Sequence, residues 1–147
     1  MNINEALNQG ANILRKNLIK SAQLDSEILM SKVINKNRKF IILNSKNKMD
    51  LKNYHFFNKL ILERSKGKPI AYLINKKDFW KYEFKIEKDI LIPRPDTEII
   101  VEQALEITKN KTNLRVLDIG IGSGCILLSI LKEKKNFYGV GIDISKK

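Results

Sequence analysis

The stretch RVLDIGIGSGC, residues 115–125, constrains the fold of this 147-residue chain more than any other segment. A run of branched apolar residues leads to Asp118, and three glycines follow at alternate positions, Gly120, Gly122 and Gly124. Such an apolar run is typical of a strand buried in a parallel sheet. The next stretch, CILLSILKEKK, has the pattern of a helix, and FYGVGID has the pattern of a second strand. The order strand, glycine loop, helix, strand predicts a βαβ unit.

Residues 1–73 have the pattern of a small helical domain. Asn2 followed by Glu5 resembles a capping box, with asparagine in place of serine or threonine. Apolar residues then recur on one face of a helix, at Leu7, Ala11, Leu14 and Leu18. The stretches LDSEILMSKV and LKNYHFFNKLILERSKG predict two further helices, the second of which ends at Gly67, and RKFIILN predicts a short one.

Residues 74–147 begin with a change of period. In DFWKYEFKIE, Tyr82, Phe84 and Ile86 fall on one face, which predicts a β-hairpin. The following LIPRPDTE carries two prolines that stiffen a turn, after which Asp96 or Thr97 can cap a helix. The expected fold class is therefore α/β, with a helical domain, a β-hairpin linker and the first βαβ part of a Rossmann-like sheet.

The glycine loop and two acidic residues together predict a cofactor. Glycines allow positive φ and a close approach of the backbone to a ligand, but the spacing G-x-G-x-G differs from the G-x-G-x-x-G loop that binds a pyrophosphate. Asp118, before the loop, would repel a pyrophosphate and attract an ammonium group. Asp143 follows Gly124 by 19 residues, about where an acid binds ribose hydroxyls in nucleotide sites. These features predict S-adenosylmethionine, a zwitterion that carries a ribose and no phosphate.

The sequence also allows purely structural roles for the same residues. Asp118 can cap a turn, Asp143 can cap a following helix, and a glycine loop alone is weak support for a cofactor site. A nicotinamide oxidoreductase is a further alternative, which the glycine spacing and Asp118 disfavour.

Composition narrows the class of protein. The chain has one cysteine and no apolar run near the ~20 residues of a membrane span, which favours a cytoplasmic protein without a membrane partner. We expect that cysteine, Cys125, to pack rather than react. The single histidine, His55, cannot form a metal site by itself, so no metal is expected. The net charge of +12 comes from scattered lysines, as on an ordinary solvated surface, so nucleic-acid binding is disfavoured.

Three stretches resemble one known family. GKPIAYLINKKDFWKYEFKIEKDILIPRPDTEIIVEQAL, VLDIGIGSGCILLSI and VGIDIS are similar to the PrmC or HemK family of protein-(glutamine-N5) methyltransferases, which act on peptide chain release factors. The resemblance implies a class I methyltransferase sheet and S-adenosyl-L-methionine as the cofactor. It implies that the cofactor loop is formed by Gly120, Ile121, Gly122, Ser123 and Gly124. It further implies that Asp143 binds the ribose, that Asp118 lies near the methionine end, and that Arg94 and Thr97 belong to a motif that closes over the cofactor.

The implied reaction is methyl transfer to the glutamine amide in the Gly-Gly-Gln motif of class I release factors, with residues 1–73 helping to hold that partner. The family's catalytic Asn-Pro-Pro-Tyr does not occur in this chain, so no catalytic residue is assigned and we expect a fragment. Two other functions stay open. One is a catalytically dead module that binds a release factor or the ribosome, and the other is a related methyltransferase acting on a ribosomal-protein glutamine or on adenine N6.

Overall fold

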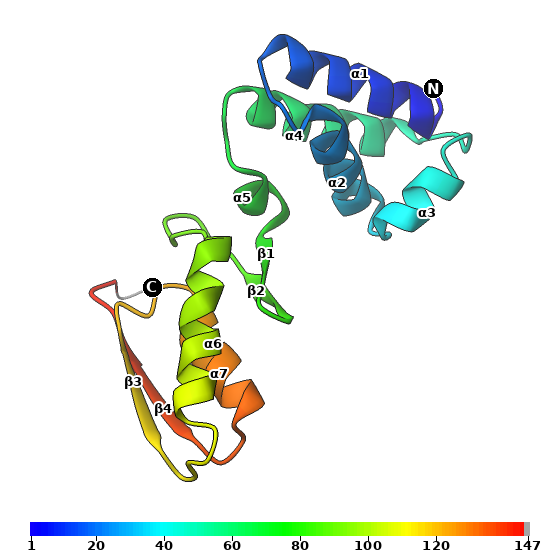
Figure 1. Ribbon diagram of the computed structural model, residues 1–147. Helices are drawn as coiled ribbons and strands as arrows, with labels where there is room; N and C mark the ends of the chain where they lie inside the picture. The colour runs from blue at the N-terminus through cyan, green and yellow to red at the C-terminus, as the bar shows by residue number, and fades with distance from the viewer. Residues whose placement is uncertain (146–147) are drawn as a thin grey trace. The chain divides into compact units, whose positions relative to one another are not determined.

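The computed structural model describes residues 1–145 and contains two compact units, Met1–Ile74 and Asn75–Lys147. We call them the helical unit and the sheet unit. Each unit has its own hydrophobic cluster, and the two clusters share no residue. The helical unit consists of α1 (Ile3–Lys16), α2 (Ala22–Ile34), α3 (Arg38–Leu43), α4 (Leu51–Ser65) and α5 (Ile70–Ile74) (Figure 1).

The start of α1 confirms the predicted capping box. The Asn2 side chain accepts the Glu5 N–H at 2.8 Å, and the Glu5 carboxylate accepts the Asn2 N–H at 2.9 Å. The prediction for the end of this helix is wrong at Leu18, which was expected on its apolar face. The helix ends at Lys16, and Leu18 takes a left-handed φ of 60° and is 89% exposed. The chain therefore turns out of the helix before it reaches Leu18, the last residue of the apolar pattern.

The core of the helical unit lies where α1, α2 and α4 meet. Its fully buried side chains include Leu14, Leu29, Met30, Phe57 and Ile61. Gly10 lets these helices come close, because a Cβ atom there would lie 2.8 Å from Phe57 Cζ.

The sheet unit begins with the predicted hairpin and continues into the predicted βαβ unit. The hairpin strands pair antiparallel from Lys76↔Lys85 to Phe79↔Tyr82, and the two later strands pair parallel from Arg115↔Tyr138 to Ile119↔Ile142. The elements are β1 (Lys76–Phe79), β2 (Tyr82–Lys85), the 3-10 turn η1 (Pro95–Thr97), α6 (Glu98–Ile107), β3 (Arg115–Ile119), α7 (Cys125–Glu133) and β4 (Tyr138–Ile142). The expected α/β fold class is confirmed, since a helical region is followed by a hairpin and a parallel βαβ crossover.

Helices α6 and α7 cover one face of the β3–β4 sheet (Figure 1). The cluster beneath them contains Phe79 and Phe84 from the hairpin, Val101 from α6, and Cys125 and Ile130 from α7. On the same face, Gly139 of β4 leaves room for α7: a Cβ atom there would lie 2.6 Å from Leu131 Cδ1. The hairpin, both helices and the sheet therefore share one core.

The sequence predicted a β3 strand buried on both sides, and this prediction is wrong for the opposite face of the sheet. The register places Arg115 and five large apolar or aromatic side chains on that face. Each of the five is about half exposed or more: Leu117, Ile119, Tyr138, Val140 and Ile142. We call this set the open sheet face. The apolar run in β3 supplies residues for two faces, and among residues 1–145 helices cover only one of them.

Candidate functional site

The glycine loop turns the chain sharply at the end of β3. Gly120, Gly122 and Gly124 have φ values of 79°, 52° and 75°, the left-handed region that glycine enters at little cost. The N–H groups of Gly120 and Ile121 both donate to the Ile142 carbonyl, at 2.8 and 3.0 Å. A Cβ atom at Gly120 would meet nothing within 4 Å, so the backbone there is open to a ligand.

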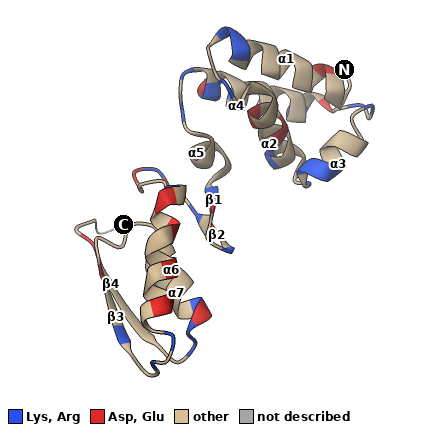
Figure 2. Cartoon of the chain, in the orientation of Figure 1, with Lys and Arg blue, Asp and Glu red and all other residues tan. Residues whose placement is uncertain are grey.

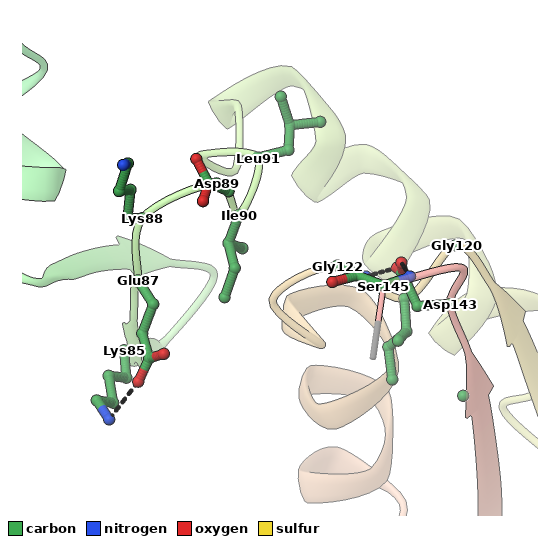
Figure 3. Close-up of a pocket in the computed structure, with 12 residues that line it drawn as sticks. Lys85, Glu87, Lys88, Asp89, Ile90, Leu91, Gly120, Gly122, Asp143 and Ser145 are labelled. Carbon is green, nitrogen blue, oxygen red and sulfur yellow. Dashed lines mark hydrogen bonds and ion pairs between the residues drawn. The ribbon is translucent and has the colours of Figure 1, made fainter. Parts of the chain in front are cut away.

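Asp143, directly after β4, holds the middle of this loop. Its Oδ2 accepts the Gly122 N–H at 2.9 Å, and its Oδ1 accepts the Ser145 N–H at 2.9 Å (Figure 3). The bonds from Ser145 and Gly122 lower the pKa of Asp143, so the carboxylate stays ionised at neutral pH. A carboxylate has about four lone-pair sites, so Asp143 can still accept from two hydroxyl groups of a ligand.

A pocket of about 730 Å³ lies beside the loop. Gly120, Ile121, Gly122 and Asp143 line it, and these are four of the nine predicted site residues. The remaining lining comes mostly from residues 85–91, which Figure 3 shows as a separate wall facing the loop. Its volume is within the range of roughly 300–1,000 Å³ found for small-molecule sites.

The wall formed by residues 85–91 was not anticipated from the sequence. Lys85 and Glu87 form an exposed ion pair at 2.6 Å, which raises the pKa of Lys85 and lowers that of Glu87. Asp89 takes a left-handed φ of 73°. The polar run KIEKD between a strand and two prolines is the signal that points to a turn here, but nothing in it indicates which other segment the turn faces.

Three predicted loop and strand residues lie outside this pocket lining. Gly124 is buried, and its Cβ position would be 3.0 Å from Leu128 Cδ1, so it serves the entry into α7. The Ser123 side chain lowers the pKa of the Cys125 thiol, against the stronger effect of burial. Asp118 pairs with Gly141 in the parallel register. Burial raises the pKa of Cys125, and the charge of Asp118 raises it further, so Asp118 lies near the start of α7.

Arg94 and Thr97 lie in the turn before α6, also outside the pocket lining. The Thr97 N–H donates to the Arg94 carbonyl at 3.1 Å, which closes the 3-10 turn. The side-chain cap that the sequence predicts at this point is not formed by Thr97 within the described residues. The turn leads directly into α6, and Thr97 already has helical backbone angles, so it does not take the extended conformation of a capping residue.

Two further residues that the sequence analysis considered, Cys125 and His55, do not line the pocket. Cys125 is buried and packs in the core of the sheet unit. His55 is exposed on α4, with its ring centroid 6.0 Å from that of Tyr54. Residues 1–145 contain no cluster of three or more potential metal-ligating side chains. Over the same range, no helix has the length and hydrophobicity needed to cross a bilayer.

Comparison with known proteins gives the same family for both units. Residues 5–74 match the family described as the PrmC N-terminal domain. A release factor glutamine methyltransferase from Buchnera aphidicola subsp. Baizongia pistaciae is 43% identical over 136 residues, which is 92% of this chain and 49% of that protein. The protein of the same name from Haemophilus influenzae is 37% identical over 139 residues, 90% of this chain and 48% of that protein.

The chain thus spans about half the length of the curated relatives that it matches. The match runs through the helical unit and into the sheet unit, because it covers nine-tenths of the 147 residues. On these grounds the chain belongs to the PrmC family, whose relatives are named release factor glutamine methyltransferases.

Proposed function

We propose that this chain supplies the cofactor site and the partner-holding domain of an enzyme that methylates release factors. The methyl group passes from S-adenosyl-L-methionine to the glutamine amide of the Gly-Gly-Gln motif in class I release factors. The observation that carries the proposal is the glycine loop held by Asp143 beside a pocket of about 730 Å³, in a chain of this family. Residues 74–147 bind the cofactor, and residues 1–73 help to hold the release factor.

The chemistry of the pocket residues fits this cofactor. Gly120 presents open backbone where a ligand can approach closely, and Asp143 presents an ionised carboxylate for the two ribose hydroxyls. Asp118, at the end of β3, adds negative charge that favours the ammonium group. When bound, S-adenosylmethionine supplies a methyl group activated by a sulfonium. The residues of this chain bind and orient that molecule, and positioning of this kind carries much of the barrier reduction in group transfer.

This chain contributes residues that bind the cofactor, and we assign none of its residues to the chemical step. The 147 residues do not include Asn-Pro-Pro-Tyr, the motif by which the family positions the substrate amide. We therefore assign turnover to a protein of the relatives' full length, and cofactor binding to this chain.

Calorimetric titration of the chain with S-adenosylhomocysteine, and with NADH in parallel, tests the proposal. We expect saturable binding of S-adenosylhomocysteine and no heat of binding with NADH. A chain that is folded by circular dichroism and binds neither compound would contradict the cofactor assignment. It would favour a module that binds the release factor or the ribosome without a cofactor.

A further inference from the structure

The hairpin turn of the sheet unit contains a backbone conformation that its residue disfavours. Phe79 pairs with Tyr82, so Trp80 and Lys81 form a two-residue turn. Trp80, the first of the two, has a φ of 56° in the left-handed region, a place where such turns usually carry glycine or asparagine. A bulky residue persists in this conformation only where surrounding contacts hold it.

Two carboxylates from two helices hold this turn. The Trp80 backbone N–H donates to Glu98 Oε1 at 2.8 Å, and its indole N–H donates to Glu133 Oε1 at 3.3 Å. The same Glu133 oxygen receives the Tyr82 hydroxyl at 3.1 Å and pairs with Lys81 Nζ at 2.9 Å. Glu98 is the first residue of α6 and Glu133 is the last residue of α7, so the turn joins the two helices.

Glu98 also directly follows the turn that contains Arg94 and Thr97. Within the described residues, neither of those side chains caps α6. A carboxylate in the first turn of a helix is commonly explained by the helix dipole alone. Here the Glu98 side chain instead reaches a backbone donor 18 residues earlier in the chain and ties the start of α6 to the hairpin.

We propose that Glu98 is a positioning residue: by accepting the Trp80 N–H, it fixes residues 94–98. Arg94 and Thr97 of this turn do not line the pocket, and the family resemblance assigns them to the motif that closes over the cofactor. The inference rests on the proposed function for its consequence in binding. The structural claim, that residues 94–98 are held in place through Trp80, is independent of that function.

Two substitutions of Glu98 and one control separate this role from a general effect of charge. Glu98→Ala removes the acceptor, whereas Glu98→Gln keeps a side-chain oxygen that can accept the Trp80 N–H. Glu102→Ala removes an exposed carboxylate from the same helix and serves as the matched control. Each variant is titrated with S-adenosylhomocysteine, and hydrogen–deuterium exchange is measured on the peptide that covers residues 94–98.

We expect Glu98→Ala to speed exchange at residues 94–98 and to weaken S-adenosylhomocysteine binding about tenfold, because the ligand must then order a turn that the lost hydrogen bond no longer holds. Glu98→Gln should stay within about threefold of the parent chain, because it retains a neutral hydrogen bond. Glu102→Ala should match the parent chain in both measurements. Equal affinity of Glu98→Ala and the parent chain, or equal losses in Glu98→Ala and Glu102→Ala, would overturn the positioning role.

The exchange measurement keeps this inference separate from the proposed function. If the parent chain does not bind S-adenosylhomocysteine, the cofactor assignment fails, and exchange alone decides whether Glu98 fixes residues 94–98. Unchanged exchange in Glu98→Ala would overturn the inference whether or not the chain binds the cofactor.

Discussion

Asp143 holds Gly122 and Ser145 through their backbone N–H groups, and the same two bonds lower the pKa of its carboxyl group. One side chain therefore shapes the loop and supplies the negative charge beside the pocket. The sequence predicted an acid at this position from its distance to the glycines. It gave no sign that the acid binds the glycine loop itself, because that contact joins two strand ends through the fold.

Asp143→Ala is expected to weaken S-adenosylhomocysteine binding by about tenfold or more, since it removes both the loop contact and the acceptor that we propose for the ribose. Calorimetric titration measures the change. Asp78→Ala, an exposed acid on β1 away from the pocket lining, is the matched control. Affinities of the Asp143 and Asp78 variants that agree within error would remove Asp143 from the site.

Gly10 supports a separate prediction in the helical unit. Gly10→Ala would place a Cβ atom 2.8 Å from Phe57 Cζ and 2.9 Å from Ile61 Cδ1. Alanine gains about 1 kcal/mol of helix propensity over glycine, and overpacking costs about 1–3 kcal/mol, so we expect a net loss of stability. Urea unfolding followed by circular dichroism measures it. Asn8→Ala, an exposed position on the same helix, should not lose stability, and a stabilised Gly10→Ala would contradict the close packing.

At the scale of elements, α7 is joined to the hairpin by Glu133. The bond from Lys81 lowers the pKa of Glu133, against burial, and the Tyr82 and Trp80 donors lower it further. A carboxyl group whose pKa is lower in the folded state stabilises the fold above its unfolded pKa, and that stabilisation disappears as the pH falls through the folded pKa. The attachment of α7 to the hairpin should therefore weaken in acid.

Glu133→Gln tests this dependence on pH. The melting temperature of the parent chain should fall from pH 5 to pH 3 more steeply than that of the variant, because the variant has no carboxyl group at this position to protonate. At pH 7 the variant should melt at the lower temperature. Parallel curves for the two proteins would show that Glu133 does not contribute to the acid sensitivity.

Elements with a local signal were predictable from the sequence, and contacts between elements were not. The capping box at Asn2, the alternation around Phe84 and the glycine loop each depend on neighbours along the chain. Helix α5, Ile70–Ile74, was not predicted because five residues are too few to reveal a helical period. The wall formed by residues 85–91 was not predicted because it depends on a contact between segments. These residues face the glycine loop only in the folded unit.

At the scale of the whole molecule, the net charge is unevenly divided between the two units. The helical unit has 14 basic and 5 acidic residues, and the sheet unit has 14 basic and 11 acidic residues. The five acids of the helical unit all have partners: Glu5 and Asp50 cap helices, and Asp25, Glu27 and Glu63 pair with basic side chains. Figure 2 marks the lysine and arginine positions of this unit in blue and its acidic positions in red. An acidic partner would be attracted to this unit, most strongly at low salt.

The open sheet face predicts association through apolar surface. Five large side chains side by side form a patch that monomeric proteins rarely leave exposed. We expect the chain to bind the dye ANS and to self-associate at high concentration. Val140→Lys should reduce both, whereas Leu18→Lys, at an isolated exposed position in the helical unit, should reduce neither. Sedimentation equilibrium measures the association, and equal behaviour of the two variants would contradict this role of the face.

The strained turn also makes this protein a convenient subject for fluorescence. Trp80 is the single tryptophan of the chain, and its indole N–H lies against Glu133 in the sheet unit. Its emission therefore reports on the hairpin turn and its contacts, while the helical unit contributes only tyrosine and phenylalanine signals. On one sample, tryptophan emission follows the sheet unit, whereas far-ultraviolet circular dichroism follows the helices of both units, α6 and α7 included. The order in which the units unfold is thus readable without any added label.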